Sequence, residues 1–180
     1  NIPDPWTNGT IDNPGANTLY AQWEDDGHGV GDDCIFLGED GRATTTAQGT
    51  FYYYDQGDTA YFEQTFSIPR GEVTWAGLIL DYSAWTNSTW GMTGMFRLAV
   101  YINNVVVWAI SFDSISAENV WYSTGLISVN TSLINVTSTT IRVTLEATQS
   151  VGYSPDIQPR LRVDNVRVFI AAKARSSDVS

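Results

Sequence analysis

Carboxylate side chains are the residues in this chain best suited to chemistry, and the most unusual of them is Asp164. In the segment RLRVDNVRVF, residues 160–169, Leu161 and Val163 share one face of an expected strand. The valines that follow Asn165 have the other parity, because successive side chains of a strand point to opposite faces. The apolar face therefore switches at Asp164. A carboxylate buried there without a partner would cost folding free energy, so we expect it to be neutralised.

Other residue combinations give little support to catalysis. A Ser-His-Asp arrangement could use only His28, and the chain has no G-x-S-x-G turn. One histidine and one cysteine, Cys34, make a poor zinc site. A glycosidase needs two carboxylates that face each other across a cleft, and nothing in the sequence selects a pair among Glu63, Asp81 and Glu146. The sequence therefore predicts a protein that is not an enzyme.

Exposed aromatic rings would suit a different chemistry, the stacking of sugar rings. The stretch DYSAWTNSTWGM offers Tyr82, Trp85 and Trp90 for this role. The alternative is that the tryptophans fill the core, since 13% of the residues are aromatic. Glycan binding at these three residues is thus one of two interpretations that the sequence allows.

Four N-x-[ST] sequons mark a further kind of site, at Asn8, Asn87, Asn130 and Asn135. Each is an acceptor for N-linked glycan in an exported chain, and a modified asparagine must face solvent. The chain begins at Asn1 without an initiator methionine, as expected of a mature product whose leader has been removed. We therefore expect a secreted glycoprotein, extracellular or on the cell surface, with accidental sequons as the alternative.

Composition excludes several classes of partner. The formal net charge is -11, which disfavours nucleic acid because phosphates require a basic face. No apolar run approaches the ~18 residues of a membrane span. The chain has 180 residues, 43% of them hydrophobic, enough for one domain with a core. The single cysteine, Cys34, is expected as a buried thiol or, alternatively, in an intermolecular disulfide.

The elements that must position these residues are strands. Aromatic and β-branched residues gather in short runs that proline and glycine interrupt, and no window holds a helical period over three turns. In the clearest hairpin, Asn103 and Asn104 tolerate the positive φ of a tight turn. Short strands with turn signals between them indicate a sandwich or a barrel. The expected strands cover 51–55, 60–68, 73–85, the hairpin 95–112, 125–130, 139–148 and 160–169.

Several of these strands resemble the jelly-roll sandwich of secreted carbohydrate-binding modules. YFEQTFSIPRGEVTWAGLILDY resembles the Q-T-F-x-I-P-x-G strand of that family, TIRVTLEAT follows after a hairpin, and RLRVDNVRVF resembles the terminal V-D-N-V strand. The resemblance spans roughly residues 18–170 and implies an all-β fold, an antiparallel jelly-roll β-sandwich. Because the motifs are short, they bear on the fold more than on the function.

The same resemblance implies a calcium site. In many such modules the aspartate of the last strand helps to hold a structural calcium, together with acids of the first strands, which makes Asp164 the candidate. Calcium takes about six to eight oxygen ligands, and the stretch WEDDGHGVGDD could supply them. The acids of that stretch are Glu24, Asp25, Asp26, Asp32 and Asp33. The alternative is a solvated acidic loop, with Asp164 paired to Arg160 or Arg162.

Charge is polarised along the chain. Residues 1–41 hold nine acids and no lysine or arginine, whereas six of the nine bases lie from Arg142 onward. Contacts between unlike surfaces build open polymers when the rotation does not close, although both ends could also fold beside each other within one subunit. We therefore expect a structural subunit that binds copies of itself head to tail in a cell-surface filament, tube or layer, with calcium as a candidate stabiliser. The alternative is a non-catalytic carbohydrate-binding module.

Three regions follow from this interpretation. Residues 1–17 form an N-terminal extension in contact between subunits, 18–170 form the sandwich, and 171–180 form a C-terminal tail. The extension contains three prolines, so it cannot form a central strand by itself. We expect at least one terminus to lie against a neighbouring subunit, as a strand added to a sheet edge or through opposite charge.

Overall fold

The computed structural model describes residues 6–11, 19–24, 29–30, 34–39, 44–46, 49–68, 71–87, 94–112, 120–154 and 158–173. Within these ranges the chain forms strands and one short 3-10 turn, η2 (Thr131–Leu133), and no helix there is long and apolar enough to cross a membrane. The strands are β1 (Thr7–Ile11), β2 (Leu19–Glu24), β3 (Cys34–Glu39), β4 (Thr44–Thr46), β5 (Gly49–Tyr54), β6 (Thr59–Phe66), β7 (Glu72–Asn87), β8 (Phe96–Ile102), β9 (Val105–Ser111), β10 (Tyr122–Ser123), β11 (Ile127–Val129), β12 (Thr139–Ala147), β13 (Val151–Ser154) and β14 (Gln158–Lys173).

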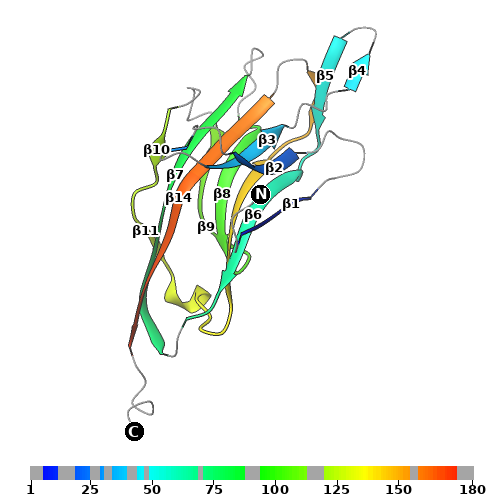
Figure 1. Cartoon of the computed structure of the whole chain (residues 1–180). Helices are drawn as coiled ribbons and strands as arrows, with labels where there is room; N and C mark the ends of the chain where they lie inside the picture. Colours follow the sequence, from blue (N-terminus) through cyan, green and yellow to red (C-terminus); the bar gives the residue numbers. More distant parts are fainter. Residues whose placement is uncertain are drawn as a thin grey trace.

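Two antiparallel sheets form the layers of a sandwich (Figure 1). The first sheet has the order β1-β6-β12-β8-β9. The second sheet has the order β10-β7-β14-β3-β2, and β11 also pairs with β7. A small third sheet, β13-β5-β4, lies at one end of the molecule. The chain is therefore an all-β antiparallel jelly-roll β-sandwich, as the sequence predicted.

The core lies between the inner faces of the first and second sheets. Alternate residues of facing strands meet there, and Phe62, Leu78, Leu98, Leu145 and Leu161 are all 0% exposed. Each such side chain contributes roughly 1.5–3 kcal/mol when it is fully buried. Because side chains alternate along a strand, this apolar layer also determines which residues must point outward from each sheet.

The face switch at Asp164 is a β-bulge in β14. The pairing of β14 with β7 shifts register between Asp164 and Arg167, and Asn165 has a φ of 50°. Because β14 holds one extra residue here, the apolar side chains that follow the bulge again point to the inner face of the sheet. Leu161 therefore faces the core before the bulge, and Val168 faces the space between the sheets after it. The break in alternation seen in the sequence has this geometric cause.

The predicted hairpin is present, with φ values of 47° at Asn103 and 65° at Asn104 between β8 and β9. Cys34 is 1% exposed, so its thiol is buried. The sequence did not predict β1, which pairs with β6 as an edge strand of the first sheet. The sandwich thus includes Thr7–Ile11, part of the expected N-terminal extension, and β14 continues beyond residue 170 to Lys173.

Candidate functional site

The outer face of the first sheet carries a polar network centred on Glu146. Arg97 Nε donates to Glu146 Oε2 over 2.6 Å. The other carboxylate oxygen, Oε1, accepts hydrogen bonds from Tyr101 Oη at 2.6 Å and from Thr144 Oγ1 at 2.7 Å. The strands β8 and β12 supply these residues, since their inward neighbours Leu98 and Leu145 turn the polar residues outward. Three donors therefore hold one carboxylate in a single orientation.

The electrostatics of this network favour fixed charges and a neutral phenol. Burial of the Tyr101 ring, and then its hydrogen bond to Glu146, raise the pKa of that hydroxyl. The hydrogen bond to Glu146 likewise raises the pKa of Arg97. At neutral pH Tyr101 therefore remains a donor and Arg97 remains a cation, so the network is preorganised for hydrogen bonding.

A second ionic pair lies on the same face. Arg142 Nε donates to Glu63 Oε2 over 2.8 Å, and the Arg142 guanidinium carbon lies 4.8 Å from the centroid of the Tyr61 ring. Tyr61 lies close over Gly9 of β1, where a Cβ would overlap its hydroxyl oxygen. A larger residue at this edge-strand position would therefore require the far end of the Tyr61 side chain to move.

A shallow hollow of about 270 Å³ connects these groups. Its lining mixes hydrogen-bond donors, acceptors and charges of both signs, a combination that suits a ligand with many hydroxyl groups more than a simple ion. We call these seven residues the polar face: Ile11, Thr59, Tyr101, Asn104, Arg142, Thr144 and Glu146.

The residues proposed from the sequence for sugar stacking do not form one platform. Tyr82 is only 6% exposed, with its ring centroid 5.5 Å from that of Trp108 and 5.8 Å from that of Tyr122. Burial, and then Tyr122, raise its pKa. Trp85 lies on the second sheet with the Arg160 guanidinium 5.4 Å from its ring centroid, and Trp90 lies outside the described residues. The prediction is wrong for Tyr82, because its strand parity turns it into the core.

Asp164 lies at the bulge with two backbone donors. Its Oδ2 accepts a hydrogen bond from Val30 N at 2.9 Å and its Oδ1 accepts one from Asn165 N at 2.6 Å. Asp81 is its partner in register on β7, and Asn165 Nδ2 donates to Asp81 Oδ2 over 3.0 Å. The carboxylate is thus hydrogen-bonded, and these bonds offset part of the desolvation free energy that its place in a strand costs.

The calcium site stays a prediction. Within the ranges that the structure describes, no three acids, histidines or cysteines converge to hold a metal ion. Asp164 and Asp81 alone would supply too few of the about six to eight oxygens that calcium takes. Glu24 ends β2, and the other proposed acids lie outside the described residues, namely Asp25, Asp26, Asp32 and Asp33.

A chelator tests this prediction. If Asp164 is a calcium ligand, the native chain should melt several degrees lower in chelator than in calcium, because the ion binds only the folded state. Asp164→Asn should melt at a lower temperature in both buffers and show no difference between them. Glu63→Gln, on the other sheet, should keep the native difference. Native melting curves that coincide in calcium and chelator would exclude the metal.

The asparagines of the described sequons differ in the hydrogen bonds that their side-chain amides make. Asn130 and Asn135 are exposed, and their side-chain oxygens accept hydrogen bonds from Ser132 N and Thr137 N, each at 3.0 Å. This Asx-turn geometry directs the amide nitrogen, the atom that would carry glycan, away from the local backbone. Asn8 instead donates its Nδ2 to the Ala21 carbonyl over 2.6 Å. Asn87 ends β7.

We expect glycan at Asn130 and Asn135 before Asn8. Intact mass spectrometry of protein from its native source should exceed the 19.8 kDa chain mass, and glycopeptide mapping should find the glycan at these two sites. In a glycosylating host, Asn130→Gln and Asn135→Gln should each remove one increment, whereas Asn8→Gln should remove less. A bare chain mass for the native protein would contradict the prediction.

No family model matches the sequence, and no curated protein matches it. Three solved structures are similar in fold. A cleaved adhesin domain of Lys-gingipain from Porphyromonas gingivalis has a TM-score of 0.52 at 12% identity, covering 97% of this chain and 94% of that one. The carbohydrate-binding module TmCBM61, solved with β-1,4-galactotriose, has a TM-score of 0.48 at 10% identity, with 93% and 90% covered. A cyclase from Fischerella has a TM-score of 0.46 at 12% identity, with 94% and 76% covered.

At these identities the similarity shows the fold alone. The resemblance to a carbohydrate-binding-module-like sandwich, seen first in the strand motifs, therefore holds for the architecture. One architecture hosts many functions, so the choice among them depends on the side chains of the outer faces.

Proposed function

We propose that this chain is an extracellular, non-catalytic module that binds carbohydrate on its polar face. The single observation that carries the proposal is the hollow lined by Tyr101, Arg142 and Glu146, in which donors and acceptors are held in place by one another. Sugar hydroxyls both donate and accept hydrogen bonds, so they match such a mixed surface. Preorganised side chains lose little rotamer freedom on binding, which favours affinity.

The spacing of carboxylates supports a role without catalysis. Glu63 lies opposite Arg142, and Glu146 lies opposite Thr59, so the two acids are four residues apart along adjacent strands. That offset separates their backbones by roughly 14 Å along the strands, at about 3.4 Å per residue. Glycosidases hold their two carboxyl groups about 5–9.5 Å apart. Each acid is also bound to an arginine, which suits a fixed binding surface.

A glycan array followed by calorimetry on the best ligand tests the proposal. Arg142→Met and Tyr101→Phe each remove polar groups from the hollow and keep most of the side-chain volume. Each should weaken binding about tenfold or more, since a hydrogen bond to a charged group is worth roughly 1.5–3 kcal/mol. Arg167→Met removes the same positive charge as Arg142→Met, but on the exposed outer face of the second sheet. It should leave the affinity for the glycan unchanged. The absence of any glycan ligand, or equal affinity in all variants, would refute the proposal.

Assembly of the chain into a head-to-tail cell-surface polymer stays a separate prediction. It depends on the charge distribution along the sequence, with acids toward one end and bases toward the other. Because β1 belongs to the sandwich, a test by truncation should remove only residues 1–5 or residues 174–180. Sedimentation of both truncated chains, compared with the full chain, then reports whether a terminus connects subunits.

A further inference from the structure

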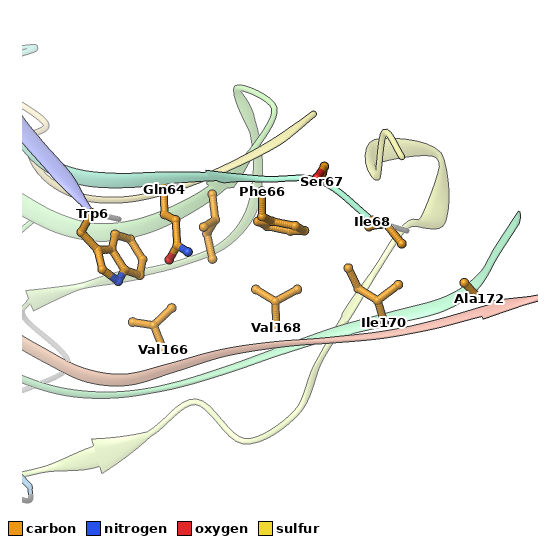
Figure 2. Close-up of a pocket in the computed structure, with 10 residues that line it drawn as sticks. Trp6, Gln64, Phe66, Ser67, Ile68, Val166, Val168, Ile170 and Ala172 are labelled. Carbon is orange, nitrogen blue, oxygen red and sulfur yellow. The ribbon is translucent and has the colours of Figure 1, made fainter. Parts of the chain in front are cut away.

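An apolar groove of about 590 Å³ opens between the two sheets (Figure 2). In Figure 2 the side chains of β6 and the segment after it face those of β14 across the opening, with Trp6 at one end. The lining residues are Trp6, Gln64, Phe66, Ser67, Ile68, Ile141, Val166, Val168, Ile170 and Ala172. Nearly all of them are apolar, so the groove does not suit a glycan.

The strands that border this groove are incompletely paired along it. Among the described residues, β3 pairs with β14 only from Arg160 to Val163, whereas β7 follows the other side of β14 down to Lys173. In the same way, β1 pairs with β6 only as far as Glu63, although β6 continues to Phe66. On the β3 side of β14, the backbone N–H and C=O groups beyond the bulge thus meet no described strand. A row of such groups recruits another strand.

The segments before Trp6 and after Lys173 have unsuitable sequences for this role. The segment before Trp6 reads NIPDP, and its two prolines lack the N–H groups that a paired strand supplies. The segment after Lys173 reads ARSSDVS and has no large apolar side chain except one valine. Neither segment would both pair with the edge of β14 and fill the groove.

Within the part of the chain that the structure describes, one edge of β14 has no strand partner beyond the bulge, and this edge is complementary to itself. It spans residues 165–173, so antiparallel pairing with the same edge of a second copy overlaps most when it is centred on Phe169. That register places Val168 opposite Ile170, and it places Arg167 opposite Ala171 and Lys173 opposite Asn165. No like charges then face each other across the pair.

We propose that this edge of β14 is a homodimer interface, in which two copies pair residues 165–173 antiparallel about a twofold axis. A twofold contact satisfies both copies at once, because each edge completes the other. It makes the second sheet continuous across the dimer over roughly 30 Å, at about 3.4 Å per residue. It also brings the two apolar grooves to the same interface.

An exposed apolar patch beside the edge supports the same contact. Phe169 is 41% exposed, Trp75 39% and Leu126 59%. Phe169 lies opposite Gly77 on β7, and a Cβ on Gly77 would lie 2.7 Å from the Trp75 ring and 2.9 Å from Leu126 Cδ1, so the three side chains surround this glycine. Pairing about Phe169 brings the patches of the two copies side by side. Contiguous apolar surface of this kind marks an interaction site.

Sedimentation velocity of the full chain across a range of concentrations tests the proposal. The native chain should pass from monomer to dimer as its concentration rises. Val168→Lys places a charge in the groove beside the paired edge and should weaken dimerisation at least tenfold. Val106→Lys changes an exposed valine of β9, 43% exposed, and should leave dimerisation as it is. Circular dichroism of both variants checks that the sandwich is folded.

Cross-linking tests the register without depending on Val168. Arg167→Cys mixed with Ala171→Cys should form a disulfide-linked heterodimer under mild oxidation, because the register places these positions opposite each other. Each variant alone should form little, since its two cysteines would be four residues apart along the edge. A chain that is monomeric at all concentrations and does not cross-link would overturn the proposal. So would an open polymer that Val168→Lys leaves intact, because another surface would then join the copies.

Discussion

Insertion of one alanine after Asn165 should lower the melting temperature of the sandwich by about 5–15 °C, or prevent folding. The bulge already holds one extra residue, which keeps the apolar side chains of β14 on the inner face although their parity changes in the sequence. A further residue would turn every following side chain to the opposite face, so Val168 and Ile170 would leave the space between the sheets. Burial of these two partly exposed side chains is worth about 2–4 kcal/mol in sum. At about 2–4 °C per kcal/mol for a chain of this size, the loss is large.

Two point variants separate the residue count from the identity of Asn165. Asn165→Gly keeps the bulge and tolerates the φ of 50°, so it should cost little beyond the lost hydrogen bond to Asp81. Asn165→Val keeps the count but strains a β-branched residue at positive φ, at a cost of about 1–3 kcal/mol. Differential scanning calorimetry should rank the insertion as the most destabilising. An insertion variant that melts within a few degrees of the native chain would show that the number of residues at the bulge does not set the face of β14.

Glu146→Ala should be the next most damaging change, with a loss of about 2–3 kcal/mol. The carboxylate is 12% exposed and accepts hydrogen bonds from Arg97, Tyr101 and Thr144. Its removal leaves a cation and the Tyr101 hydroxyl without this acceptor on a partly buried face, whereas Thr144 Oγ1 keeps the Ala99 carbonyl at 3.3 Å. An unsatisfied charged partner is costly. The same variant should lose glycan binding, because Arg97 and Tyr101 would no longer be held in place.

The matched control is Glu63→Ala on the same face. Among the described residues, the Glu63 carboxylate pairs with Arg142, and both side chains are more than a quarter exposed, so the pair should contribute about 0–1 kcal/mol. Thermal melts of the two variants, followed by circular dichroism, should therefore differ clearly. Equal stability of Glu146→Ala and Glu63→Ala would mean that the network around Glu146 contributes no more than an ordinary surface ion pair.

Much of the fold could be predicted from local patterns. Asn103 and Asn104 mark a turn because few other residues accept positive φ at both positions, and the structure places them there. Strands such as β8 and β12 were predicted because apolar residues alternate along them. By contrast, β1 carries three threonine or asparagine residues among its five, and its only large apolar residue, Ile11, is 52% exposed. An edge strand that buries little apolar surface leaves little apolar signal in its sequence.

The candidate site was not predicted, because its members are distant in sequence. Arg97 and Glu146 are 49 residues apart, and Glu63 and Arg142 are 79 apart. Glu63 and Glu146 were considered from the sequence as possible catalytic acids, yet nothing there paired each with an arginine. The useful signal was the alternation of polar and apolar residues along β8 and β12. Polar residues that alternate with buried apolar ones must share the outer face of the sheet.

The sequence by itself therefore determined that the chain is an all-β sandwich, where its hairpin turns, and that β14 changes parity at Asp164. These properties depend on residues close together along the chain, where steric limits on φ and side-chain alternation act directly. Only the tertiary structure decided that Tyr82 faces the core, that Glu146 gathers three donors, and that one edge of β14 beyond its bulge has no partner beside an apolar groove among the described strands. Strand order and register bring those residues together, and each depends on the packing of the whole sandwich instead of on any one segment.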